Sequence, residues 1–370
     1  MKILALNWRD ITHPRAGGAE VNVHEILKRL SKQNHKVTLF CGYYKGAKRH
    51  ENIEGVEIIR YGNIMTVYLW AFILYTFKLR KENYDIIFES ISGTPWMSMI
   101  YSRKPRVAMI YHIVGEIYFK EIFFPIALIA IFVESYVMPL FYKNENVLAI
   151  SESSKEEFYR MGFRNINIVP MGISKDLRPN TNAKNKDIPI IVHHGRLMNY
   201  KRIDILIRLM KEIIRKYKDA QLYIFGRGEA ERELKRLTKG LKLEKNIKFF
   251  GFVSENKKLE LLQKSWIFVT PSYKEGWGIV VLEANACGVP AISFDVPGLR
   301  DSILNNKTGY LVNSENEMLE KILVLIKDKK LRDKMSKEAY KWSRNFSWDN
   351  TADRTLEIMK KAIQTDKQSK

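Results

Sequence analysis

Cysteine is scarce in this chain of 370 residues, which contains only Cys41 and Cys287. Two cysteines supply neither a disulfide framework nor a four-cysteine zinc site, so we expect a reducing, cytoplasmic setting. Acidic side chains are also few: the sequence contains 41 Asp and Glu residues but 62 Lys and Arg residues, which gives a formal net charge of +21. This excess favours partners that carry phosphate: nucleotides, nucleic acid or an anionic membrane surface. A basic surface adapted for solubility or high temperature explains the charge equally well.

Several signatures of nucleotide and metal chemistry are missing. There is no G-x-x-x-x-G-K-[ST] loop, which excludes P-loop chemistry, and Gly226-Arg-Gly228 lacks the third glycine of a dinucleotide fingerprint. There is no Asp-x-Asp pair, and the adjacent His193 and His194 on an expected strand point to opposite faces, so they cannot share one metal ion. We therefore expect no metal and no cofactor. Without an aromatic-plus-basic module, we also expect no nucleic-acid partner.

Short apolar runs alternate with helix-length amphipathic segments along the chain. This alternation predicts parallel sheets covered on both faces. The first half contains expected helices at residues 19–30 and 153–161 and expected strands at 2–8, 36–41, 56–61, 85–89, 107–112, 147–151 and 166–169. After a polar segment the pattern restarts, with an apolar helical stripe at 203–217 and expected strands at 188–193, 221–225, 247–252, 266–270 and 291–294.

The predicted fold class is therefore α/β, with two doubly wound Rossmann-like domains that face a cleft. We expect an N-terminal domain at residues 1–175, a linker at 176–187 and a C-terminal domain at 188–345. The last segment, 346–370, is expected to form a helix that returns toward the N-terminal domain. Domain pairs of this kind bind ligands between them, at the carboxyl ends of the strands.

Two apolar stretches in the first domain allow two interpretations. Residues 64–77 and 122–133 are shorter than the ~20 residues of a membrane-spanning helix, so neither is expected to span a membrane. They are either core helices or segments that lie in a bilayer interface, with Trp70 and Phe123 among the anchors and Lys78 beside them.

The most informative motif is the stretch 272–284, which follows an expected strand and opens a helix. Gly276 and Gly278 let the backbone approach a ligand closely, and the free N–H groups at the helix start can bind an anion. Glu275 precedes the helix, and Glu283 lies about two turns inside it, where a carboxylate can accept hydrogen bonds from paired ribose hydroxyls. Strand–turn–helix units with glycine are common, so the motif alone also fits a purely structural role.

Two further loops offer ligand contacts. Arg196 and Lys201 lie between an expected strand and a helix, where two cations could bind a diphosphate. Solvated charge is the alternative, although cations at a helix start oppose its dipole. Gly17 and Gly18 follow the first strand and allow a second close approach to a ligand.

Together these segments resemble the retaining glycosyltransferases of family four, which have the GT-B fold. Glu275 to Glu283 matches the E-x7-E signature of that family. The resemblance extends over nearly the whole chain and includes the segments 17–20, the strand that ends at His112, 169–173, the Gly195–Lys201 loop, 224–228, 286–293, 295–298 and 307–312.

The resemblance implies a metal-independent, retaining hexosyltransferase. It would move a sugar from a UDP- or GDP-sugar to a lipid-linked or glycan sugar in cell-envelope or protein-glycosylation biosynthesis. The leaving phosphate itself would take the acceptor proton, which fits a sequence without an obvious protein nucleophile. The first domain is the acceptor side in this family, and it contains both apolar stretches, with basic residues beside the first of them. We therefore expect a cytoplasmic enzyme that docks peripherally on the cytoplasmic face of the membrane. A nucleotide-sugar epimerase of the same fold and a non-catalytic nucleotide-sugar-binding subunit are the alternatives.

The resemblance also implies roles for individual residues. His112 and Glu275 would contact the sugar near the reacting bond, Glu283 would bind the ribose, and Arg196 and Lys201 would neutralise the pyrophosphate. The rest of the donor site would be backbone: Gly17 and Gly18 close to the phosphates, and Gly276, Trp277, Gly278, Ile279 and Val280 around the distal phosphate and sugar.

The sequence departs from the family pattern at several positions. Position 202 is Arg where the family usually has Gly, Asn199-Tyr200 replaces Pro-Glu, and Asp301 replaces Glu. Residues 40–105 match weakly, so the resemblance does not define the acceptor.

Overall fold

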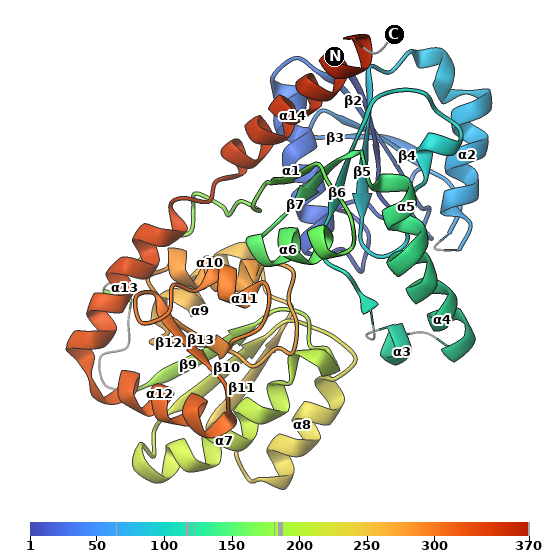
Figure 1. Cartoon of the computed structure of the whole chain (residues 1–370). Coiled ribbons are helices and arrows are strands. Elements are labelled where there is room, and N and C mark those ends of the chain that lie inside the picture. The colour runs from blue at the N-terminus through green and yellow to red at the C-terminus, as the bar shows by residue number, and fades with distance from the viewer. Residues whose placement is uncertain (64, 116–117, 122, 181, 184–187, 369–370) are drawn as a thin grey trace. The chain divides into compact units, whose positions relative to one another are not determined.

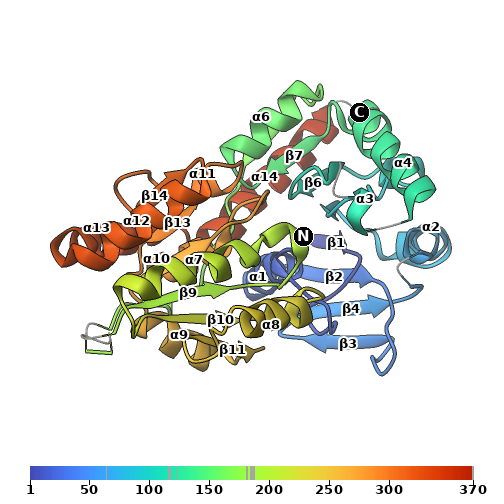
Figure 2. The ribbon, with the colours of Figure 1, turned by 90° about the horizontal axis from the view of Figure 1, so that it is seen from below.

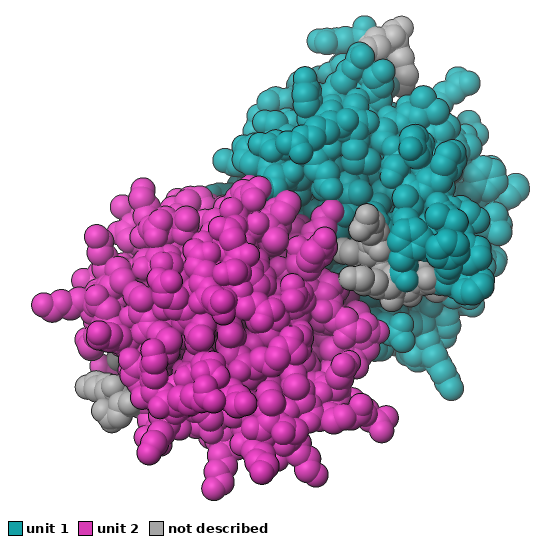
Figure 3. All heavy atoms as spheres, turned by 60° about the horizontal axis from the view of Figure 1, so that its bottom comes forward, with its two compact units in different colours: residues 1–172, 348–370 teal, residues 173–347 magenta. Residues whose placement is uncertain are grey.

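The computed structural model of the chain describes residues 1–63, 65–115, 118–121, 123–180, 182–183 and 188–368. The chain divides into two compact units, which Figure 3 colours separately. Unit 1 comprises Met1–Gly172 and Trp348–Lys370, and unit 2 comprises Ile173–Ser347. The division falls at 172/173 rather than 175/176, and of the expected linker at 176–187, residues 181 and 184–187 lie outside the described residues. Each unit is described by itself below.

Unit 1 is built on a mostly parallel sheet, as the alternation of apolar segments predicts. The strand order is β3-β4-β2-β1-β5-β6-β7-β8, and β3–β4 is an antiparallel pair (Figures 1 and 2). Sequence patterns missed β3, because it has only four residues, of which His50, Glu51 and Asn52 are polar and none is buried. The strands are β1 (Lys2–Leu6), β2 (Lys36–Cys41), β3 (His50–Ile53), β4 (Val56–Arg60), β5 (Ile86–Ile91), β6 (Arg106–Ile110), β7 (Asn146–Ala149) and β8 (Ile166–Ile168).

The helices of unit 1 include the C-terminal segment of the chain. The final helix, α14, packs against α1, and Arg29 Nε donates to Asp349 Oδ1 over 2.7 Å (Figure 1). The α-helices of unit 1 are α1 (Gly18–Lys32), α2 (Val67–Phe77), α3 (Tyr118–Glu121), α4 (Phe124–Phe132), α5 (Met138–Tyr142), α6 (Glu152–Arg160) and α14 (Trp348–Gln368), and a π-helical turn, η4 (Val133–Val137), joins α4 to α5.

The second apolar stretch forms a longer helix than its sequence suggests. The segments α4, η4 and α5 make one continuous helix, Phe124–Tyr142, of 19 residues with a mean hydropathy of 1.9. By length and composition it is the one helix in the described part of the chain that could cross a membrane, so the expectation that this stretch is too short was wrong. Only 22% of it is buried, so it is not a core helix either.

The first apolar stretch is half-buried. Helix α2 buries Val67, Ala71 and Tyr75 against unit 1, while Leu69, Phe72 and other large side chains are exposed. The first residue of each expected stretch, at 64 and 122, lies outside the described residues.

Unit 2 contains a second, fully parallel sheet with the order β11-β10-β9-β12-β13-β14 (Figure 2). Its strands are β9 (Ile190–His194), β10 (Gln221–Phe225), β11 (Ile247–Gly251), β12 (Ile267–Thr270), β13 (Ala291–Phe294) and β14 (Gly309–Val312). Its α-helices are α7 (Ile203–Lys216), α8 (Glu231–Gly240), α9 (Glu255–Lys264), α10 (Ile279–Ala286), α11 (Leu299–Ser302), α12 (Glu315–Lys327) and α13 (Lys329–Ser343). The apolar stripe of α7 lies in the core, which confirms that prediction.

Candidate active site

Two loops of unit 2 lie side by side because their strands are neighbours. Strand β12 pairs with β9 in parallel, so the loops that leave their carboxyl ends meet at one edge of the sheet. The backbone N–H of Tyr273 donates to the carbonyl of Tyr200 over 2.9 Å, which joins the two loops directly. The loop after β9 includes Arg196 and Lys201, and the loop after β12 includes Glu275.

Lys201 and Glu275 form an ion pair across these loops. The Lys201 side chain is 10% exposed and that of Glu275 is 12% exposed, and the ammonium donates to Glu275 Oε1. The Ser272 hydroxyl donates to the same oxygen over 2.8 Å. The resemblance assigned the lysine to the pyrophosphate and the glutamate to the sugar. The structure places both in one polar cluster whose carboxylate is fixed by two donors.

The turn after Glu275 ends in the helix start that the sequence predicts. Gly278 is the N-cap of α10 with φ of +72°, and a Cβ there would lie 2.8 Å from Leu299 Cδ2. The first N–H groups of a helix have no acceptor within the helix, so the backbone of Ile279 and Val280 can bind an anion. The Trp277 side chain is buried edge-on against Phe346, with ring centroids 5.2 Å apart. This ring packing holds the turn against the segment that follows α13.

Gly298 supports the same turn from the loop after β13. Its φ is +81°, and a Cβ at this position would lie 2.2 Å from the carbonyl oxygen of Glu275. Only glycine allows this approach, so the segment 295–298, which the resemblance includes, packs directly beneath the candidate catalytic glutamate.

Glu283 lies within α10 and binds a lysine that the sequence analysis did not identify. Lys258 of α9 donates to Glu283 Oε1 over 2.7 Å and also pairs with Glu255 at 2.8 Å. Burial alone would lower the pKa of Lys258, but the two carboxylates outweigh it and raise that pKa. His194 Nε2 lies 3.6 Å from Glu283 Oε2. Lys258 is one of several lysines on α9, so no local pattern distinguishes it.

The other two basic residues of the first loop differ from Lys201. Arg196 is exposed, and its guanidinium donates to the Tyr200 hydroxyl over 3.4 Å. Arg202, which stands where the family usually has glycine, has φ of +50° and forms the N-cap of α7. This left-handed conformation explains the glycine of the family pattern, because a Cβ is disfavoured there.

The two adjacent histidines are neutral core residues. Burial lowers the pKa of both His193 and His194 to about 3. His193 Nδ1 donates to the Val269 carbonyl over 2.9 Å, and His194 Nε2 donates to the Val280 carbonyl over 3.2 Å. Their protons therefore bind strand β12 and the start of α10. Within the described residues, no group of three or more His, Cys, Asp or Glu side chains could bind a metal ion.

The unit 1 residues of the candidate site gather at one edge of its sheet. Gly17 is the N-cap of α1, and its N–H donates to Glu20 over 2.7 Å. His112 follows β6, directly after Tyr111. The Tyr111 hydroxyl donates to the Ala19 carbonyl over 3.1 Å, so the Gly17–Gly18 turn and the His112 loop are held together.

Glu134 is a second residue that sequence reasoning missed. Its carboxylate contacts the backbone two and three residues after His112. The sequence could have identified Glu134, because it is the one charged residue between positions 123 and 142.

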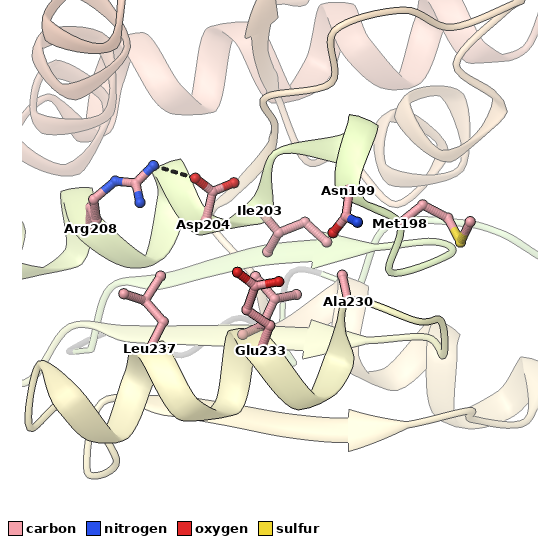
Figure 4. A pocket seen from close by; sticks show the side chains of 9 residues that line it. Met198, Asn199, Ile203, Asp204, Arg208, Ala230, Glu233 and Leu237 are labelled. Carbon is pink, nitrogen blue, oxygen red and sulfur yellow. Dashed lines mark hydrogen bonds and ion pairs between the residues drawn. The ribbon is translucent and has the colours of Figure 1, made fainter. Parts of the chain in front are cut away.

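A shallow pocket of about 170 Å³ lies between α7 and α8 (Figure 4). Asp204 and Arg208 from α7 pair with each other at its rim, and Glu233 and Leu237 of α8 line the opposite side. The loop after β9 contributes Met198 and Asn199, but none of the candidate site residues lines this pocket. We assign it no role.

Two family models match the chain, one in each unit for most of its length. The family model described as "Glycosyl transferases group 1" matches residues 174–342, and that described as "Glycosyltransferase Family 4" matches residues 16–177. An uncharacterized glycosyltransferase of Methanocaldococcus jannaschii is 25% identical over 98% of this chain and 99% of its own. The phosphatidylinositol N-acetylglucosaminyltransferase gpi3 subunit of Schizosaccharomyces pombe is 21% identical, over 94% and 78%. A Haemophilus influenzae relative is 28% identical, but the match spans only 55% of this chain and 57% of that relative.

Solved structures show the fold at full length. Sucrose-phosphate synthase from Thermosynechococcus elongatus superposes with a TM-score of 0.82 at 19% identity, covering 98% of this chain and 99% of that one. Anabaena HepE, solved in complex with UDP and glucose, superposes with a TM-score of 0.76 at 19% identity, covering 98% and 100%. The predicted α/β fold with two parallel-sheet domains is thereby confirmed.

Proposed function

We propose a donor, a mechanism and an acceptor for this chain, which is a glycosyltransferase of the family-four type with the GT-B fold. The donor is a UDP- or GDP-sugar, and the sugar is transferred with retention of configuration. The observation that carries this proposal is the polar cluster of Lys201 and Glu275 beside the start of α10, with Glu283 about one turn inside that helix. HepE, which shares the fold, is solved with UDP and glucose, a ligand pair of the class we propose here.

Unit 2 provides groups for each part of such a donor. The N–H groups at the start of α10 and the cations Arg196 and Lys201 would neutralise the diphosphate, so no metal ion is required. Glu283, held by Lys258, would accept hydrogen bonds from the ribose hydroxyls. Glu275, held by Lys201 and Ser272, would orient the hydroxyls of the transferred sugar.

Transfer then needs no protein nucleophile. The bond between the sugar's anomeric carbon and the phosphate oxygen breaks, and the acceptor oxygen bonds to the same face. The leaving phosphate oxygen takes the acceptor's proton. Lys201 and the N–H groups at the start of α10 would stabilise the transition state more than the bound donor, because negative charge develops on the leaving diphosphate as the bond breaks. In unit 1 we assign to His112 the contact with the reacting sugar, and to Gly17 and Gly18 a backbone contact with the phosphates.

The acceptor we propose is a lipid-linked sugar, reached from the cytoplasmic face of the membrane. The exposed apolar side chains of α2 and of the helix Phe124–Tyr142 support it, since Leu69, Phe72, Ile129 and Phe132 all face solvent in unit 1. Exposed basic residues follow α2 at positions 78, 80 and 81, and would be attracted to an anionic leaflet. Because the helix Phe124–Tyr142 also buries one face against unit 1, it would lie along the bilayer interface rather than cross it.

Kinetics of three matched variants test the donor assignment. Glu275→Gln should lower kcat about a hundredfold with a small change in donor KM, because it acts at the reacting sugar. Glu283→Gln should mainly raise the donor KM. Glu260→Gln, an exposed carboxylate on α9, is the control and should leave both parameters unchanged. Equal effects of the first two variants, both on KM alone, would contradict the separate roles.

A further inference from the structure

A single carboxylate interrupts the long apolar helix of unit 1. Glu134 is the only charged side chain between Phe123 and Tyr142, and its side chain is 1% exposed. It lies in the π-turn Val133–Val137, where the helix carries one extra residue in its turn. Burial of a carboxylate has a large free-energy cost unless several hydrogen-bond donors bind it. The groups that bind Glu134 therefore indicate its role.

Two partners of Glu134 belong to the loop that carries His112. Glu134 Oε1 accepts from the backbone N–H of Val114 over 2.8 Å, and Oε2 accepts from that of Gly115 over 2.7 Å. The two amides are adjacent in the chain, so one carboxylate binds both, and Gly115 has φ of +54°, a left-handed conformation that favours glycine. A side chain from the apolar helix therefore holds the loop after β6 at two adjacent backbone amides.

The helix is fixed to unit 1 along one face only. Ala127, Glu134, Met138 and Tyr142 are buried at helical spacing, and the Tyr142 hydroxyl binds the buried Glu89 of β5. On the other side, the exposed large side chains are Phe124, Ile126, Leu128, Ile129, Phe132, Tyr136, Leu140 and Phe141. The same helix therefore presents an apolar surface outward and a carboxylate inward, to the candidate catalytic loop.

We propose that Glu134 is a positioning residue for the His112 loop, and that docking of this helix on an anionic bilayer orders the loop for transfer. The inference rests on the proposed function, in which the bilayer supplies the acceptor. Contact with lipid restricts the motion of the helix, and the two hydrogen bonds of Glu134 transmit that restriction to residues 113–115. Transfer would then be favoured only where the acceptor is present.

Amide hydrogen exchange of the full chain tests this directly. Vesicles of phosphatidylglycerol and phosphatidylcholine should slow exchange at 124–141 and at 113–115, whereas pure phosphatidylcholine vesicles should do so much less. Glu134→Gln keeps the shape of the side chain but lacks the second acceptor. It should speed exchange at 113–115 about tenfold or more without lipid, and vesicles should no longer slow it there, although binding persists. Its kcat should fall with the donor KM unchanged.

Two further variants separate this role from a structural one. Glu134→Asp keeps the charge on a shorter side chain, so exchange at 113–115 and kcat should be intermediate. The double variant Ile129→Ser/Phe132→Ser keeps Glu134 and removes exposed apolar area. It should retain the loop's protection without lipid and lose the response to vesicles.

The outcomes distinguish this inference from the proposed function. If vesicles slow exchange at 124–141 but not at 113–115 in the native chain, docking stands and the coupling through Glu134 is refuted. If vesicles change exchange nowhere, the membrane acceptor itself is wrong and the inference falls with it. Should Glu134→Gln fail to fold, native exchange rates in Glu134→Asp would refute the positioning role.

Discussion

Replacing Lys258 by methionine should destabilise unit 2 far more than replacing its neighbour Lys257. Both lysines lie on α9, and each forms an ion pair at 2.7–2.8 Å. The Lys258–Glu283 pair is 14% and 16% exposed, whereas the Lys257–Glu260 pair is 43% and 41% exposed. Glu260 also keeps Lys264 as a partner at 2.6 Å, while for Glu283 the one other basic side chain within 4 Å among the described residues is the neutral His194.

The expected magnitudes follow from this burial. Removing one partner of a fully buried pair costs about 3–5 kcal/mol, and we expect about 1–3 kcal/mol for Lys258→Met because the pair keeps some contact with solvent. Lys257→Met should cost about 0–0.5 kcal/mol. The pKa of Lys258 is raised in the folded state, so its contribution is fully present below the unfolded value near 10.5 and is lost as the pH rises beyond it.

Urea denaturation of the native chain and both variants at pH 7.5 measures the difference. Lys258→Met should also raise the donor KM, since Glu283 loses the lysine that fixes its orientation for the ribose. Equal free energies of unfolding for the two variants, together with an unchanged donor KM, would refute the assignment of Lys258 as the residue that holds Glu283.

Three further predictions concern the backbone and the buried histidines. Arg202→Gly should be about 0.5–1 kcal/mol more stable than Arg202→Ala in denaturation experiments, because both lose the side chain but only glycine suits φ of +50°; a less stable glycine variant would contradict the strain. Gly298→Ala should cost more than about 2 kcal/mol and also lower kcat, since its Cβ would displace the Glu275 backbone; native stability and activity would refute the close approach. The pKa values of His193 and His194, about 3 in the folded chain, lie below the unfolded value near 6.5. Their contribution to the free energy of unfolding is therefore complete above pH 6.5 and decreases as the pH falls below it. Each of the two histidines takes up a proton on unfolding, so the free energy of unfolding should change with pH by up to about 2.7 kcal/mol per pH unit between pH 5 and 6. His193→Gln should halve this slope.

The sequence alone predicted those strands and helices that have a clear local pattern of apolar and polar residues. The alternation of apolar runs and amphipathic segments predicted the strands of both sheets, apart from the short β3 and β14, and the spacing of apolar residues located α7. The helix Phe124–Tyr142 was misjudged because Glu134 was taken as the end of an apolar run. In the structure, that carboxylate turns inward and the helix continues past it.

The contacts that define the candidate site are not local. Lys201 and Glu275 are 74 positions apart, and Lys258 and Glu283 are 25 apart. Each pair forms because parallel strands or packed helices bring distant segments together. The periodicity of the sequence does not predict which lysine forms an ion pair with which glutamate. The motifs therefore predicted which residues belong to the site, while the structure supplied their partners.

One measurement tests the central claim, that this chain moves a sugar from a nucleotide sugar to a lipid-linked acceptor without a metal ion. The chain is incubated with radiolabelled UDP- and GDP-sugars, a membrane lipid extract and EDTA, and the label that enters the organic phase is counted. We expect label from one donor to enter that phase with the native chain, and far less with Lys201→Met, which lacks the cation beside Glu275. Transfer that stops in EDTA and returns with manganese would contradict the metal-independent mechanism, and label that moves only to soluble sugars would contradict the lipid-linked acceptor.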